Sequence, residues 1–381
     1  MAHDEINNGE PLLYDPLFET PPDTVIRDTP GRGFFGKAAV KKAVFVLVLL
    51  LFVGVSIGLS LTSLTKAKFR YEETDGGMML SEYIADKNDA VLEIGPVFSE
   101  DGSTQTDGRV VAVRRFALCC NETTAFIFIG KDVVDIPETA FYSCTALQAV
   151  LVDPENPYYC SDNGVLYRLA DGRPTELMLC PARSDLYRAM LALGEQPPAN
   201  AKAAEAFAAR SKALKEKSET WLEALKKDDA PAALTDPEQK AWTAALGYNV
   251  LPGVTEIGAM AFAECETLFH VALPEGIQTF QTMAFFKCVN LRSLRLPEST
   301  EAIGSDAFSY CEKLPEIYIP AAVKTIGHHA FFGCKGAAEI RMACAENAAP
   351  QLGQNWLPQQ KRGLFMHKVP VVYNAERGAD A

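Results

Sequence analysis

Apolar side chains recur every 23 residues through the C-terminal half of the chain. The pair Ala-Phe returns at this interval from Ala261-Phe262 onward, and a cysteine follows each phenylalanine after three residues. A short segment of alternating apolar residues comes next, such as Leu294 and Leu296. Alternation of this kind is typical of a strand with one buried face. The period therefore predicts stacked coils with one strand in each.

The repeated phenylalanines and cysteines mark the inside of this stack. A single strand cannot bury its apolar face alone, so each coil needs a copy above and a copy below. Equivalent side chains then stack in the core, where a free cysteine behaves as a small apolar residue. An earlier unit with the same spacing extends the set. The predicted core ladder contains Phe141, Phe262, Phe285, Phe308, Phe331, Cys144, Cys265, Cys288, Cys311 and Cys334.

The fold class follows from the period and from leucines at i, i+3 and i+5, as in Leu291, Leu294 and Leu296. These features predict an α/β repeat solenoid of the leucine-rich-repeat kind with a 23-residue period. A short helical stretch is expected at each Ala-Phe pair. Prolines such as Pro297 and Pro320 are expected to end the strands, because proline supplies no ladder donor.

A helical hairpin interrupts the repeats at residues 183–248. The first helix is predicted at 201–227, with Asn200 as N-cap and an exposed Glu223–Lys227 pair. The second begins at the capping-box pattern of residues 235–238 and ends at Gly247. The apolar stripe of the hairpin either packs on the side of the solenoid, the interpretation we prefer, or binds a partner helix.

Residues 43–64 form a run of 22 residues without a charge, which is long enough to span a hydrocarbon core of about 30 Å as one helix. A cleaved signal peptide fits less well, because 42 residues precede the run. Basic residues are more frequent before the run than after it, which favours an N-terminus inside the cell. We therefore expect a single-pass membrane protein with the repeats outside.

The remaining segments complete the expected domain organisation. Residues 1–38 are rich in proline and acids and predict a disordered cytoplasmic tail, in which an apolar island at 11–18 is a candidate motif for a cytoplasmic partner. The stretches Val91–Phe98 and Arg109–Leu118 predict a hairpin. The other expected segments are a stalk and N-terminal cap at 71–124, a first repeat with a hairpin at 125–182, further repeats at 249–342, and a C-terminal cap and tail at 343–381, in which 369–373 forms a last strand and Trp356 closes the core.

Two strings carry a family resemblance. Val254–Cys265 and the segment 156–167, with its Asn163-Gly164 turn, resemble the BspA-like, type-5 leucine-rich repeat of bacterial surface proteins. The resemblance covers about residues 125–182 and 249–375. It implies adhesion or recognition at the cell surface, and it names no ligand.

Residue patterns typical of catalysis are missing from the sequence. It contains no G-x-S-x-G or H-E-x-x-H motif and no Cys pair at zinc-ligand spacing. The net charge of −13 argues against nucleic-acid binding. We expect no enzyme activity, no cofactor and no metal. The ten cysteines all follow the predicted span, and the disulfide state of five of them stays open: Cys119, Cys120, Cys160, Cys180 and Cys344.

A ligand-binding surface is predicted on the outward side of the strands. Residues between the inward leucines should form two columns across the sheet, the first starting at Ala149 and the second at Leu151. Arginine and tyrosine are favoured at interfaces, so the columns form a candidate basic-aromatic strip. Its residues are His270, Ser293, Arg295, Glu316, Tyr318, Glu339 and Arg341.

Two functions fit these features. In the first, a membrane-anchored surface protein recognises a protein or a glycan through the exposed solenoid sheet. In the alternative, a structural or regulatory envelope protein binds envelope components through its ectodomain and a cytoplasmic partner through its N-terminal tail.

Overall fold

The computed structural model describes residues 67–227, 235–362 and 365–376, which fall within one compact unit at 65–381. In this part of the chain no helix combines the length and the apolar character needed to cross a membrane. The predicted tail at 1–38 and the predicted membrane span at 43–64 lie outside the described residues.

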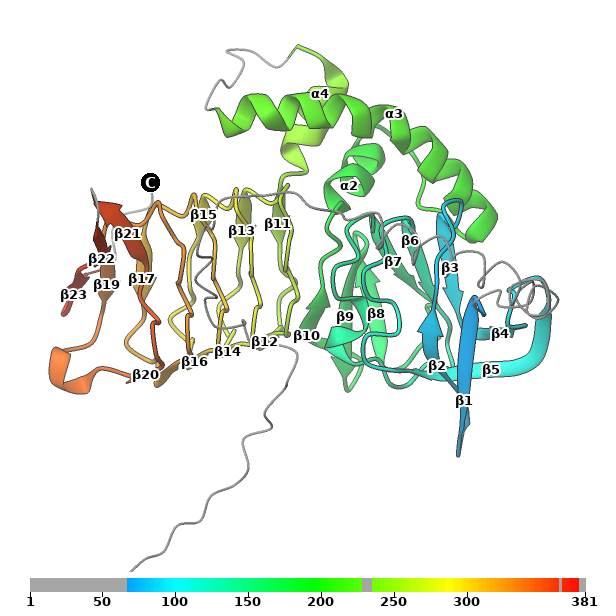
Figure 1. Cartoon of the computed structure of the whole chain (residues 1–381), viewed down its shortest axis with the longest axis horizontal. Helices are drawn as coiled ribbons and strands as arrows, with labels where there is room; N and C mark the ends of the chain where they lie inside the picture. Colours follow the sequence, from blue (N-terminus) through cyan, green and yellow to red (C-terminus); the bar gives the residue numbers. More distant parts are fainter. Residues whose placement is uncertain (1–66, 228–234, 363–364, 377–381) are drawn as a thin grey trace, which may run out of the picture. The chain divides into compact units, whose positions relative to one another are not determined.

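The coils place their strands in two rows, and the first row carries the predicted repeat strands (Figure 1). We call these the front strands. They pair in parallel, and His270 lies opposite Ser293 as Ile317 lies opposite Ile340, each pair 23 residues apart. The front strands form three sheets: β3 (Val91–Ile94), β6 (Phe126–Ile129) and β7 (Ala149–Val152); β11 (Gly247–Asn249), β13 (His270–Ala272) and β15 (Ser293–Leu294); β17 (Ile317–Ile319), β19 (Ile340–Met342) and β23 (Val371–Val372).

The second row forms one continuous parallel sheet on the opposite side of the coils. Its strands are β10 (Arg173–Leu179), β12 (Glu256–Ile257), β14 (Thr279–Phe280), β16 (Ala302–Ile303), β18 (Thr325–Ile326) and β20 (Gln351–Leu352). Two antiparallel strands, β9 (Val165–Ala170) and β8 (Tyr159–Asp162), extend this sheet beyond β10. Asn163 and Gly164 connect them with φ of 48° and 81°, the left-handed pair that a tight hairpin turn requires.

The expected short helix at each Ala-Phe pair is wrong. The chain forms turns there, because two residues in each turn adopt left-handed backbone angles; Met283 has φ of 59° and Lys287 has φ of 56°. A left-handed residue interrupts a right-handed helical run. The exception in the first repeat is a short 3-10 helix, η2 (Glu138–Phe141), and a second, η3 (Glu346–Ala348), lies before β20.

The C-terminal core is a stack of phenylalanine rings. Phe262 and Phe285 lie 4.5 Å apart between ring centroids, and Phe285 and Phe308 lie 5.3 Å apart, both nearly parallel. Phe331 continues the stack at 5.3 Å from Phe308. Phe141 belongs to a separate core formed by the N-terminal coils. The predicted ladder is therefore divided between two cores.

The recurring cysteines connect neighbouring coils. The thiol of Cys288 donates to the carbonyl oxygen of Phe262 at 3.0 Å, and the thiol of Cys311 donates to that of Phe285 at 3.2 Å. Cys334 repeats the contact with Phe308 at 3.1 Å. Each of these thiols is buried, so the position requires a small side chain that carries a weak donor.

The solenoid begins earlier than predicted. β3 and β6 lie in parallel beside β7, so coils already form within the segment 71–124 and at its border. The expected hairpin survives only in part, because β4 (Pro96–Phe98) pairs with β5 (Gln105–Val113) while β3 joins the solenoid. An antiparallel pair, β1 (Phe69–Thr74) and β2 (Gly77–Tyr83), completes the four-stranded sheet at this end.

At the C-terminal end, β23 pairs with β19, as expected for a last strand, and Trp356 is buried in the adjoining core. A hairpin of β21 (Gln359–Arg362) and β22 (Phe365–Lys368) lies between them in the chain. The sequence analysis did not identify this hairpin.

In its described residues, 183–227 and 235–248, the insertion contains three helices: α2 (Ser184–Ala192), α3 (Ala201–Lys226) and α4 (Pro237–Ala244). Asn200 caps α3, and Asp236 caps α4. Helix α2 was not predicted. Gly247 does not end a helix but begins β11, and the surface pair on α3 joins Glu223 to Lys226 at 3.0 Å rather than to Lys227.

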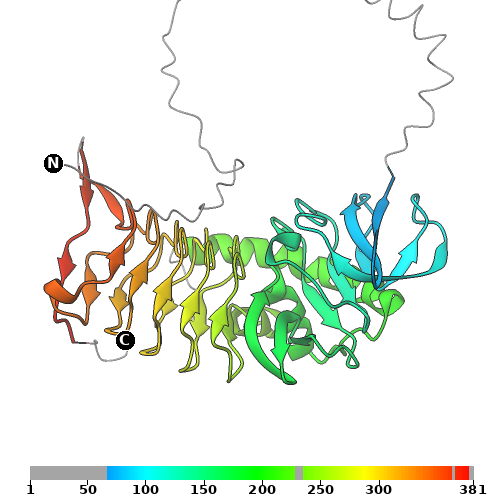
Figure 2. The same ribbon diagram turned by 90° about the horizontal axis from the view of Figure 1, so that it is seen from below.

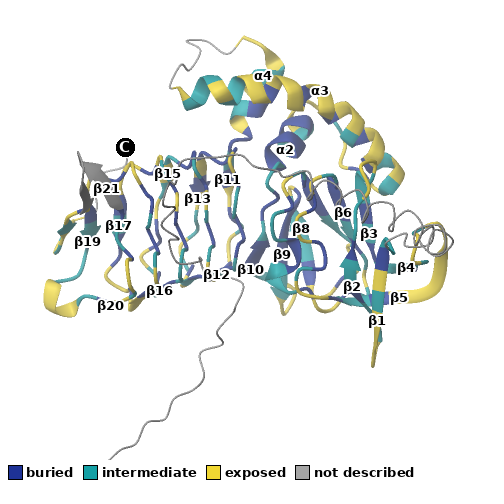
Figure 3. Ribbon diagram, in the orientation of Figure 1, coloured by how far each residue is buried: buried dark blue, intermediate teal, exposed yellow. Residues whose placement is uncertain are grey.

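The helices pack on the outward face of the first front strands (Figure 3). This is the interpretation that we preferred to binding of a partner helix. Phe207 of α3 and Tyr187 of α2 lie against Phe126, with ring centroids 5.5 and 6.0 Å away. This packing buries Phe126 and Ala149. Figure 2 shows the helices behind the coils when the molecule is seen from below.

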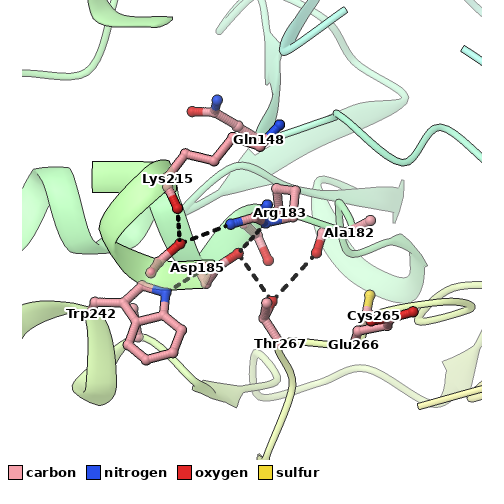
Figure 4. Close-up of polar contacts among 12 residues, drawn as sticks. Gln148, Ala182, Arg183, Asp185, Lys215, Trp242, Cys265, Glu266 and Thr267 are labelled. Atoms are coloured by element: carbon pink, nitrogen blue, oxygen red, sulfur yellow. Dashed lines mark hydrogen bonds and ion pairs between the residues drawn. The ribbon is translucent and has the colours of Figure 1, made fainter. Parts of the chain in front are cut away.

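A buried carboxylate ties the insertion to the coils (Figure 4). Asp185 of α2 accepts hydrogen bonds from the indole of Trp242 at 2.7 Å and from the hydroxyl of Thr267 at 3.0 Å. Arg183 pairs with it at 3.3 Å and donates to Ser218 of α3 at 3.1 Å. One side chain thus joins α2, α4 and the turn before β13.

Candidate recognition surface

The predicted strip lies on the outward side of the front strands in the C-terminal coils. Glycan- or protein-sized ligands could approach it there, because five of its residues are exposed: His270, Ser293, Arg295, Glu316 and Glu339. Tyr318 and Arg341 are half-buried and lie opposite each other on β17 and β19. His270 and Ser293 form the equivalent pair on β13 and β15.

The strip is less basic than its sequence suggests. Arg341 donates to the carboxylate of Glu316 at 3.0 Å and lies 3.8 Å from that of Glu339. It also donates to the backbone carbonyl of Glu376 at 2.6 Å. These contacts hold the guanidinium in place and neutralise much of its charge, so the surface has mixed charge rather than a positive field.

The two predicted columns are not continuous. The strands β15 and β17 belong to different sheets, which separates His270 and Ser293 from Tyr318 and Arg341. Ala149 and Leu151 do not precede His270 and Ala272, because Gly247 and Asn249 of β11 hold those places. The coil that contains β11 follows the insertion and lies directly beside the coil of β13. The 23-residue period alone did not reveal this coil.

The C-terminal end of α3 lies near the start of this surface. Arg292, one residue before β15, donates to the carbonyl oxygen of Leu225 at 2.8 Å. Its guanidinium lies 5.1 Å from the ring centroid of Phe269. The insertion therefore contacts the coils that carry His270 and Ser293.

The front strands of the N-terminal coils carry outward columns of their own, where no site was predicted. Glu93 lies opposite Phe128, and Phe128 lies opposite Leu151. The signal was present, since Phe126 precedes Ala149 by the same period of 23 residues. The chemistry of this segment is acidic and apolar, in contrast to the arginines and tyrosine of the C-terminal coils.

Two open grooves border the insertion. One, of about 600 Å³, lies between the second half of α3 and the coil turns, and its charged walls pair internally, as in Lys287 with Glu264 at 3.2 Å. The other, of about 530 Å³, lies along the outward side of β3, β6 and β7. Both volumes fall in the range of about 300–1,000 Å³ that is usual for ligand sites.

A group of carboxylates around the buried Glu176 lies on the opposite side, at the junction of the two cores. Glu176 of β10 lies opposite Glu256 of β12 and accepts a hydrogen bond from Arg168 at 2.7 Å. Burial raises the pKa of Glu176 to about 7, because the Arg168 charge offsets only part of the desolvation and the nearby Glu138 and Glu256 raise it further. The second oxygen of Glu176 is buried and makes no hydrogen bond within the described residues.

The described cysteines are free thiols, with Cys119 and Cys120 exposed. No group of three or more His, Cys, Asp or Glu side chains in the described part of the chain is placed to hold a metal ion. The residues His328 and His329 lie in a coil turn, where His328 accepts a hydrogen bond from the backbone of Gln354.

Comparison with known proteins adds a family assignment for the repeats. No curated protein matches the chain. Among solved structures, the pneumococcal vaccine antigen PcpA is 17% identical with a TM-score of 0.43, covering 67% of this chain and 50% of that one. A leucine-rich repeat protein from Eubacterium ventriosum is 16% identical with a TM-score of 0.38, covering 62% and 49%. The chain thus spans about half the length of both proteins.

A leucine-rich cell surface protein from Faecalibacterium prausnitzii is 15% identical with a TM-score of 0.33, covering 76% of this chain and 72% of that one. At these TM-scores the likenesses say nothing about a ligand. Residues 244–347 match the family described as BspA type Leucine rich repeat region, in six copies. This segment of the chain is therefore a BspA-type leucine-rich repeat region.

Proposed function

We propose that the chain is a membrane-anchored surface protein of the bacterial leucine-rich-repeat type, which recognises a protein or a glycan and catalyses no reaction. The observation that carries the proposal is the outward face of the C-terminal front strands, where polar and charged side chains stand on a rigid repeat. Solenoids commonly bind through such extended surfaces. The predicted span at 43–64 would hold the repeats at the cell exterior.

The strip suits recognition because an aromatic side chain, Tyr318, lies beside an arginine, Arg341, at its centre. Tyr318 presents an aromatic ring next to Arg341, whose geometry is fixed by Glu316 and Glu339. A side chain that is already ordered loses less entropy on binding. Arg295 is exposed directly after β15, in the coil before Tyr318, and can contact the same ligand.

The test uses the full chain in detergent micelles, applied to arrays of glycans and of purified extracellular proteins. The double variant Arg295→Ala/Tyr318→Ala should reduce binding to the selected ligand by about tenfold or more, since interface arginines and tyrosines often contribute over 1 kcal/mol each. The matched control is Arg173→Ala/Tyr158→Ala, which removes one arginine and one tyrosine away from the strip, both exposed, on β10 and before β8. Equal affinity of the two double variants would contradict this site.

Location is tested separately on intact cells with a membrane-impermeant protease and mass spectrometry. Release of peptides from residues 67–376 is expected if the repeats lie outside. Protection of these peptides would contradict the proposed location and leave an intracellular scaffold.

A further inference from the structure

The groove of about 530 Å³ along β3, β6 and β7 is built jointly by the solenoid and the insertion. The floor contains Phe128 and Leu151, which are half-buried on the outward side of their strands. Pro198, in the segment that leads into α3, forms part of the wall and is buried. The insertion covers Phe126 and Ala149 completely but leaves the next outward column open.

The charged side chains in this groove are acidic. Glu93 lies opposite Phe128 on β3, and Asp153 follows β7 directly. Among the described residues that line the groove there is no lysine, arginine or histidine. The Glu93 carboxylate makes no hydrogen bond or ion pair within the described part of the chain, and the Asp153 carboxylate accepts only the backbone N–H of Glu155, at 2.8 Å.

This arrangement differs from the larger groove beside the second half of α3. There, Lys287 pairs with Glu264 and Lys226 pairs with Glu223, so both lysines in its walls are already paired with carboxylates. In the groove along β3, β6 and β7, two half-buried carboxylates stand beside apolar side chains and form no ion pair among the described residues. Lys131, which is paired with Glu155, is near enough to Asp153 to interact with its charge but does not pair with it directly. A half-buried carboxylate gains more from a cation than one in open water, because the local dielectric is lower.

We propose that this groove is a second binding site, which takes a peptide segment carrying a lysine or arginine next to an apolar side chain. The ammonium or guanidinium group lies between Glu93 and Asp153, and the neighbouring apolar side chain covers Phe128 and Leu151. The net charge of −13 attracts basic partners to the whole chain, and this groove combines acidic side chains with an apolar floor.

The test measures fluorescence polarisation of three labelled 12-residue peptides with the full chain in detergent micelles. The peptides differ only at their centre, which reads Leu-Lys-Leu, Leu-Gln-Leu or Leu-Glu-Leu. The lysine peptide should bind at least about tenfold more tightly than the glutamine peptide, the value of one charge-assisted contact. Similar affinities for the lysine and glutamine peptides would overturn the proposal.

Variants locate the binding. Glu93→Gln combined with Asp153→Asn keeps the shape and the acceptor for Glu155, and it should reduce the lysine peptide to the affinity of the glutamine peptide. Glu122→Gln combined with Asp171→Asn removes two negative charges from exposed residues outside the groove, and it should leave binding unchanged. An equal loss in this control would show attraction by the acidic surface at large and would overturn the site.

Two further variants separate this site from the strip. Glu93→Lys should exchange the preference, so that the glutamate peptide binds more tightly than the lysine peptide. Arg295→Ala/Tyr318→Ala should have no effect on the lysine peptide; a loss there would place its binding on the strip and overturn the groove. Failure of the groove would leave the proposed function of the strip untouched.

Discussion

Single residues in this protein owe their identity to the coil next to them. Each coil is in van der Waals contact with the coil before it, so a substitution at one position disturbs the packing of the residue 23 positions away. Gly333 shows this, because a Cβ atom on it would lie 2.8 Å from the Tyr310 ring of the preceding coil. Two predictions belong to this scale.

Replacement of Gly333 by alanine should destabilise the protein more than replacement of Gly172. Both glycines have left-handed angles, φ of 74° and 72°, so both substitutions carry a backbone cost of about 1 kcal/mol. Gly172 has nothing within 4 Å of the added atom, whereas Gly333→Ala must displace Tyr310 at a further cost of about 1–3 kcal/mol. Chemical denaturation of both variants measures the difference, and equal losses would show that the ring yields freely.

Glu176 should make stability fall as the pH rises. Its pKa is raised from 4.5 to about 7 in the folded protein, so the folded state holds a proton that the unfolded chain releases. The associated stability is fully present below about pH 4.5 and is lost as the pH rises through 7. Glu176→Gln should therefore be more stable than the parent at pH 8 by about 1–2 kcal/mol, since solvent screens part of the shift.

The comparison for Glu176 is the difference in unfolding free energy between pH 5 and pH 8. Glu275→Gln, an exposed carboxyl in a coil turn, serves as the control and should follow the parent at both pH values. A Glu176→Gln variant with the pH dependence of the parent would show that this carboxyl remains ionised in the folded state.

At the scale of the element, the coil is held by ring stacking and by thiol–carbonyl contacts rather than by long strands. The strands β12, β14, β16 and β18 of the second row contain two residues each. Their few ladder hydrogen bonds cannot by themselves hold a coil in register. The register comes from side chains that meet their equivalents in the neighbouring coil.

Phe285→Ala should therefore be among the most damaging substitutions in the repeats. Phe285 is fully buried between Phe262 and Phe308, and its loss leaves a cavity that neighbouring coils cannot close, at about 3–5 kcal/mol. The adjacent Phe286 is half-buried and meets Tyr310 edge to face. Phe286→Ala should cost under about 1.5 kcal/mol. Denaturant midpoints of the two variants give the comparison, and a similar loss for both would refute a role for the stack.

In the molecule as a whole, the two hydrophobic cores unfold either in a single transition or in two separate transitions. The N-terminal coils and the C-terminal coils have separate cores, and a third cluster holds the helices against the outward face of both. Asp185 lies at the centre of this connection, with partners from α4 and from the turn before β13. Its replacement should weaken the coupling as well as the stability.

Asp185→Ala should cost about 3 kcal/mol, because it leaves Trp242, Thr267 and Arg183 without their common acceptor. We also expect two transitions in place of one. In a Trp356→Phe background, the fluorescence of Trp221 and Trp242, which then reports on the helices, should change at lower denaturant than the circular dichroism of the sheets.

The control for Asp185 is Lys217→Ala, which removes an exposed ion pair with Glu238 between α3 and α4. Its cost should be under about 1 kcal/mol, with both probes in agreement. Coincident transitions in Asp185→Ala would show that the insertion and the coils unfold as one unit without this carboxylate.

The repeat, its period and the side chains of the C-terminal core, from Phe262 to Cys334, were predictable from the chain alone. These follow from local spacing, because every coil repeats the same environment and the same residue must fill it. The same reasoning located α3 and its cap at Asn200, since capping depends on neighbours in the chain.

Contacts between distant segments of the chain set the remaining features. These are the place where the coils begin, the division of the strip between two sheets and the exposure of the outward residues. β3 and β11 are recognisable as coil strands from their partners rather than from their own few residues. Ala149 is buried because α2 and α3 cover it, although it occupies an outward position. The groove beside Glu93 and Asp153 exists for the same reason, since one wall comes from the insertion and the other from the coils. Contacts between segments distant in the chain leave no periodic signal, so a single sequence could not reveal them.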